Sequence, residues 1–128
     1  MIVKPDYIGY WLTEQGMKGF FKINLKEAHQ EKNSIKFTGT CKDCLGESDI
    51  KGNLNGKEVY FEKNYTKKNV SNDAIDSTII YHGERSKTFY EGQYHSLDWK
   101  HKGIFIFENY PLNLSRTLEA LLDKEFEK

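Results

Sequence analysis

The chain has 128 residues, with 19 basic and 19 acidic side chains, so it carries no net charge at neutral pH. This balance provides no field that would attract nucleic acid or an anionic membrane, and we expect neither as a partner. The length suits a single domain, residues 1–128, that buries its own core. Eight Phe, eight Tyr and only two Pro favour β-structure.

Period-two alternation of apolar and polar residues recurs along most of the chain and predicts eight strands. Their expected ranges are 7–14, 19–27, 34–41, 47–54, 58–66, 77–84, 87–95 and 103–109. The connections are short and polar, apart from two longer ones at 67–76 and 96–102. Asn55-Gly56 predicts a type I′ hairpin turn.

The period changes after Pro111, where apolar residues recur at helical spacing. Ser115 suits an N-cap, and the pattern predicts an amphipathic helix over about 115–127. Its apolar stripe consists of Leu118, Leu121, Leu122 and Phe126. We expect this stripe to pack on the outside of the sheet.

Eight sequential strands without intervening helices exclude a parallel sheet and predict an antiparallel meander. A twisted meander of this length closes readily, because closure removes the unpaired edges. We therefore predict an all-β fold: an eight-stranded antiparallel up-and-down β-barrel over about 7–110 with the C-terminal helix outside. The alternative is an open β-sandwich of the same strands.

The sequence favours the cytoplasm. The start, MIVKPDYIGYW, lacks the apolar core and cleavage site of a signal peptide. No apolar run approaches the roughly 20 residues that span a bilayer. Two cysteines three residues apart do not form a disulfide framework, so we expect reduced thiols.

Cys41 and Cys44 form a C-x-x-C, a pattern typical of zinc and redox sites. Tetrahedral zinc needs about four ligands, and His95 and His101 are expected across the barrel from the cysteines. A redox thiol of this kind needs a helix N-terminus, which a hairpin does not supply. We interpret Asp43 and Gly46 as turn formers, and we predict no metal and no cofactor.

A longer run of glycines and aromatics resembles the small barrels of the calycin type, the lipocalin-like and avidin-like up-and-down barrels. The first strand adds Gly9-Tyr10-Trp11, which is similar to the G-x-W of those families. The run is Phe37, Gly39, Asp43, Gly46, Ile50, Gly52, Val59, Phe61, Lys63, Tyr65, Tyr81, Gly83, Tyr90, Gly92, Tyr94, Gly103, Phe105 and Phe107. The resemblance implies a ligand-binding barrel, but only Trp11 and Trp99 are tryptophans, so biotin is not expected.

In an up-and-down barrel the connections after strands 1, 3, 5 and 7 share one end, which we call the mouth. The faces predict an apolar floor of Leu25, Ile35, Leu54, Val59, Tyr90 and Phe107. Towards the mouth, an ammonium and several hydroxyls join an aromatic wall, which fits a small acidic amphiphile. The candidate ligand-binding residues are Trp11, Phe21, Ser48, Lys63, Tyr65, Tyr94 and Phe105.

Two other interpretations stay open. Lys63 either pairs with an interior acid or lies on a shifted strand that faces outward. The barrel is alternatively filled by its own side chains and acts as a protein–protein interaction or structural module, for instance as a homodimer. No pair of an acid and a base can be named, so catalytic residues are not assigned and the sequence favours a non-enzymatic role.

Overall fold

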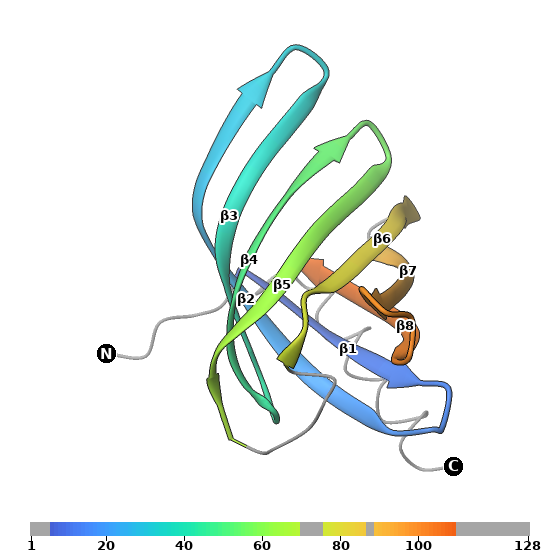
Figure 1. The fold of residues 1–128 in the computed structure, drawn as a ribbon. Coiled ribbons are helices and arrows are strands. Elements are labelled where there is room, and N and C mark those ends of the chain that lie inside the picture. Colours follow the sequence, from blue (N-terminus) through green and yellow to red (C-terminus); the bar gives the residue numbers. More distant parts are fainter. Residues whose placement is uncertain (1–5, 70–75, 87–88, 110–128) are drawn as a thin grey trace.

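The computed structural model describes residues 6–69, 76–86 and 89–109, which form a closed antiparallel barrel (Figure 1). Its eight strands follow one another around the barrel in chain order. They are β1 (Tyr7–Thr13), β2 (Lys18–Glu31), β3 (Ser34–Asp43), β4 (Gly46–Asn55), β5 (Glu58–Lys68), β6 (Ile79–Ser86), β7 (Phe89–Ser96) and β8 (Lys102–Asn109).

Pairing between the first and last strands confirms closure. β1 pairs with β8 from Tyr7↔Asn109 to Thr13↔Gly103, and with β2 on its other side. The predicted barrel is therefore confirmed, and the open sandwich is excluded. The predicted helix over 115–127 lies outside the described residues.

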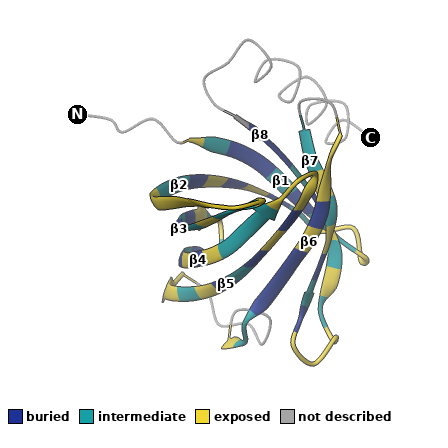
Figure 2. Cartoon of the chain, turned by 90° about the horizontal axis from the view of Figure 1, so that it is seen from above, coloured by how far each residue is buried: buried dark blue, intermediate teal, exposed yellow. Residues whose placement is uncertain are grey.

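The alternation that predicted the strands also sets the inner face. Figure 2 shows buried and exposed positions alternating along the strands. On β5, Val59, Phe61 and Lys63 are each at most 2% exposed, while Tyr60 between them is 37% exposed. β-strand geometry points successive side chains to opposite faces, so one register error would have inverted this pattern.

β2 is longer than the sequence predicts, since it ends at Glu31 instead of at about 27. β2 and β3 form one long hairpin and β4 and β5 another, and β2 continues past its last pair with β1, Tyr7↔Ile23, at the end opposite the mouth (Figure 1). β2 accommodates this extension with a bulge between Leu25 and Glu27. The polar stretch from Lys26 to Glu31 hid the extension, because it carries little apolar alternation.

The turn between β4 and β5 differs by one position from the prediction. Asn55 pairs with Glu58, so the two central residues are Gly56 and Lys57. Gly56 has a φ of 65°, and Lys57 is not among the non-glycine residues with positive φ. A glycine with positive φ at the first central position is the type II′ pattern, so the predicted type I′ turn is wrong.

Candidate functional site

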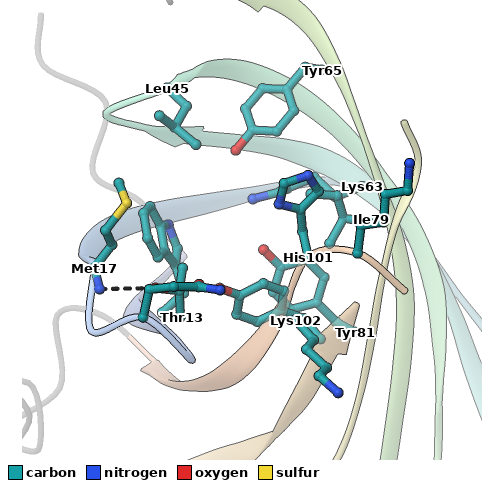
Figure 3. Close-up of a pocket in the computed structure, with 13 residues that line it drawn as sticks. Thr13, Met17, Leu45, Lys63, Tyr65, Ile79, Tyr81, His101 and Lys102 are labelled. Carbon is teal, nitrogen blue, oxygen red and sulfur yellow. Dashed lines mark hydrogen bonds between the residues drawn. The ribbon is translucent and has the colours of Figure 1, made fainter. Parts of the chain in front are cut away.

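A cavity of about 310 Å³ opens at the mouth of the barrel, and we call it the mouth cavity (Figure 3). Its walls come from β1, the β1–β2 and β3–β4 turns, β5 to β7, the β7–β8 connection and the start of β8. The lining residues are Trp11, Thr13, Gln15, Met17, Leu45, Lys63, Tyr65, Ile79, Tyr81, Tyr94, Lys100, His101 and Lys102.

A buried ion pair lies beside this cavity. Lys63 Nζ on β5 is 3.1 Å from Asp43 Oδ2 at the end of β3, and the two side chains are 2% and 1% exposed. The hydroxyl of Tyr65 donates to the same oxygen at 2.6 Å. Asp43 Oδ1 accepts the backbone N–H groups of Leu45 and Gly46 at 2.8 and 3.2 Å. The carboxylate therefore anchors the β3–β4 turn and compensates the positive charge of Lys63.

The surroundings keep Lys63 charged. Burial by itself lowers the pKa of Lys63, but the titratable groups around the ammonium raise it well above its usual value, and Asp43 is the one among them that is charged at neutral pH. These groups are Tyr81, Cys41, Tyr65 and Asp43. The ammonium also lies 4.9 Å from the ring centre of Tyr65 and 5.1 Å from that of Tyr81, within cation–π range.

The phenols near the ammonium stay neutral. Burial raises the pKa of Tyr81 to about 12, although the charge of Lys63 opposes this change. Burial also raises the pKa of Tyr65 and of Tyr94. These hydroxyls can donate or accept hydrogen bonds at neutral pH, but they are poor general bases there.

Four of the seven predicted site residues line the mouth cavity: Trp11, Lys63, Tyr65 and Tyr94. The other three lie elsewhere in the interior. Phe21 and Phe105 are 2% and 3% exposed and belong to the hydrophobic core. Ser48 is 1% exposed, and its hydroxyl donates to the carbonyl of Cys41 at 3.2 Å.

Sequence reasoning missed the central acid of the cluster. Asp43 was interpreted as a turn former, which it is, but β3 continues through it with the same inward parity as Gly39 and Cys41. Extending the predicted third strand from 41 to 43 would have placed a carboxylate on the inner face. Of the two alternatives for Lys63, the structure supports pairing with an interior acid.

The rim of the cavity is cationic on the β7–β8 side. Lys100, His101 and Lys102 all line it, and Lys102 is 3.4 Å from Glu14. Asp98 stabilises the conformation of the β7–β8 connection, because its Oδ1 accepts hydrogen bonds from Ser96 Oγ at 2.6 Å and from the backbone N–H of Lys100 at 3.0 Å. These hydrogen bonds lower the pKa of Asp98.

Trp11 contributes a buried donor without an acceptor. The residue is 5% exposed, and its Nε1 has no hydrogen-bond partner among the described residues. The indole packs over Gly19 on β2, where a Cβ would come within 2.1 Å of Trp11 Cζ2. A buried indole N–H ordinarily finds an acceptor, and none of the described residues supplies one to Trp11.

The two cysteines of the C-x-x-C have opposite environments. Cys41 faces the interior at 2% exposed, whereas Cys44 is exposed on the turn. Burial raises the pKa of the Cys41 thiol to about 11, and burial also raises the pKa of Cys44. No group of three or more His, Cys, Asp or Glu that could hold a metal ion occurs within residues 6–69, 76–86 and 89–109.

We expect iodoacetamide to modify only Cys44 in the folded protein. A thiol with a pKa of about 11 is ionised in about one molecule in a thousand at pH 8, and Cys41 is also shielded from the reagent. Intact-protein mass spectrometry should show one adduct under native conditions and two in urea. Two adducts at similar rates without urea would contradict the inward position of Cys41.

Comparison with known proteins assigns no family. No model of a known protein family matches the chain, and no curated protein matches it significantly. Among the described residues there is also no helix long and apolar enough to cross a membrane. The inference about function therefore depends on the site itself.

Proposed function

We propose that this protein binds a small acidic amphiphile in the mouth cavity, and we assign no catalytic residues. The observation that carries the proposal is the polarity gradient of that cavity. Its inner wall combines the apolar Ile79 and aromatic rings with Lys63, whose charge Asp43 compensates, while Leu45 lies at the mouth and the rim carries Lys100 and Lys102. A volume of about 310 Å³ is at the lower end of the range for small-molecule sites.

The charges favour one orientation of the ligand. Asp43 already neutralises Lys63, so an ionised acid placed beside them would be a second buried anion without a counter-ion of its own. The acidic group is better accommodated at the rim, near Lys100 and Lys102. The apolar part then occupies the interior, and an oxygen on the ligand would provide the acceptor that Trp11 Nε1 lacks among the described residues.

Octanoate and octanol test this proposal, since their alkyl chains have the same length and only octanoate is charged. We expect calorimetric titration to show octanoate binding that Leu45→Trp removes by filling the cavity. Lys100→Met should weaken octanoate about two- to fivefold, the value of an exposed ion pair, and leave octanol unchanged. Lys100 is preferred to Lys102, which already faces Glu14.

Equal affinity of octanoate and octanol would contradict the acidic part of the proposal. Octanoate binding that survives Leu45→Trp would contradict the location. Native mass spectrometry of protein purified from its own host then identifies a retained ligand directly.

We also propose that the chain is of the calycin type. The up-and-down strand order and the inward Trp11 of Gly9-Tyr10-Trp11 on β1 support this assignment. Barrels of that type hold small molecules at the mouth, in agreement with the function proposed above.

A protein–protein interaction role is the second candidate. Leu97 and Trp99 on the β7–β8 connection are 61% and 60% exposed, and Trp99 has a φ of 63°, which is uncommon outside glycine. Its ring stacks on His95 with centroids 3.5 Å apart. The exposed apolar side chains of Leu97 and Trp99 suit a contact with another protein or with a second copy of the chain. The interaction role becomes the leading candidate if neither octanoate nor octanol binds.

A further inference from the structure

A second cavity, of about 190 Å³, lies at the end of the barrel opposite the mouth, and we call it the far cavity. Its walls include Leu25 and Ala28 on β2, Ile35 on β3, Leu54 on β4 and Val59 on β5. Every side chain that lines it is apolar or aromatic, and no charged group does.

The two long hairpins produce this cavity. β2 continues past its last pair with β1, Tyr7↔Ile23, and the two hairpins line much of the space at this end of the barrel (Figure 1). Ile35 and Leu54 line that space and are only half-buried, and Ala28 is exposed. The sequence predicted a closed floor here, so the hydrophobic opening is a consequence of the strand extensions.

Aromatic rings separate the far cavity from the mouth cavity. Phe61 lines the far cavity, Tyr81 lines the mouth cavity, and the two rings stack with centroids 4.5 Å apart. Phe105 and Phe107 pack against the same stack at ring distances of 5.2 to 6.2 Å. The two cavities therefore have different walls and different chemistry.

We propose that the far cavity is a second binding site, which takes a small uncharged apolar molecule such as a single aromatic ring or a short alkyl chain. A cavity whose lining is mostly apolar, with Tyr7 and Tyr90 as its only hydroxyl side chains among the described residues, offers water few partners. Apolar cavities of about 150 Å³ in other proteins take up benzene or xenon. A charged ligand would be buried here without a counter-ion. The site is independent of the function proposed for the mouth.

Benzene tests the proposal on the full-length protein. We expect benzene to shift the methyl NMR signals of Ile35, Leu54 and Val59 at the far cavity, and to leave those of Leu45 and Ile79 at the mouth unchanged. Ala28→Trp should fill the far cavity from its exposed edge and weaken benzene binding about tenfold or more. The matched variant Leu45→Trp adds the same ring at the mouth and should leave benzene affinity unchanged.

Three results would overturn the proposal. Benzene shifts confined to Leu45 and Ile79 would assign apolar binding to the mouth. An absence of shifts at millimolar benzene would show that the far cavity is not a ligand site. A dimer in sedimentation velocity that Ala28→Trp dissociates would assign the far cavity to a second copy of the chain. The methyl shifts of the unmodified protein decide the question even if Ala28→Trp folds poorly.

Discussion

Lys63→Met is expected to lower the free energy of unfolding by about 3–5 kcal/mol. The substitution keeps most of the apolar stem and removes the ammonium. Asp43 is then left as a buried carboxylate, 1% exposed, and among the described residues its remaining donors are Tyr65 and two backbone N–H groups. Urea denaturation measures the loss.

A double-mutant cycle separates the loss of the ion pair from the loss of packing. Asp43→Asn alone leaves the Lys63 ammonium buried without its anion, so it should also destabilise. The double variant Asp43→Asn with Lys63→Met removes both charges, while the amide oxygen can still accept the N–H groups of Leu45 and Gly46. We expect it to be more stable than either single variant.

Lys36→Met is the matched control. Lys36 forms an ion pair with Glu31 at 3.5 Å, but the two side chains are 62% and 54% exposed. The same chemical change there should cost at most about 1 kcal/mol. Equal effects of Lys63→Met and Lys36→Met would show that the Asp43–Lys63 pair is not buried in solution.

The barrel could be predicted because its signals are local. Alternation along each strand fixes which side chains face inward, as with Val59, Phe61 and Lys63, and short polar turns fix the order of the strands. An antiparallel meander then has few ways to hide its edges. These arguments require no knowledge of how distant side chains meet.

The parts that could not be predicted depend on contacts between distant elements. The partner of Lys63 is twenty positions away, at the end of a strand that polar turn residues seemed to terminate at 41. The hairpin extension from Ala28 to Glu31 is held by pairing with β3, not by an apolar face of its own. The far cavity follows from that extension, so sequence reasoning placed its residues correctly but interpreted them as a closed floor.

Phe61 occupies the centre of the partition between the two cavities. It is 2% exposed, stacks on Tyr81, and packs against Phe105 and Phe107 at ring distances of 6.2 Å. Gly52 on the neighbouring β4 gives it room, because a Cβ there would lie 2.5 Å from Phe61 Cβ. The ring is therefore surrounded by groups that cannot easily move into its place.

Phe61→Ala is expected to lower the free energy of unfolding by about 3–5 kcal/mol, since it removes buried apolar contacts and leaves a hole. Phe61→Leu keeps part of the volume and should cost clearly less. Thermal unfolding by circular dichroism compares the three proteins at one concentration. A loss below about 1 kcal/mol for Phe61→Ala would contradict tight packing of the partition.

The space left by Phe61→Ala also predicts that a small apolar ligand restores part of the lost stability. Benzene should enter the space left by Phe61→Ala and raise the melting temperature of that variant more than that of the unmodified protein, because a ligand that binds only the folded state stabilises it by mass action. Phe61→Leu, which leaves less space, should respond less. Equal shifts in all three proteins would mean that the neighbouring rings have closed over the gap, so that Tyr81, Phe105 and Phe107 can separate the two cavities without Phe61.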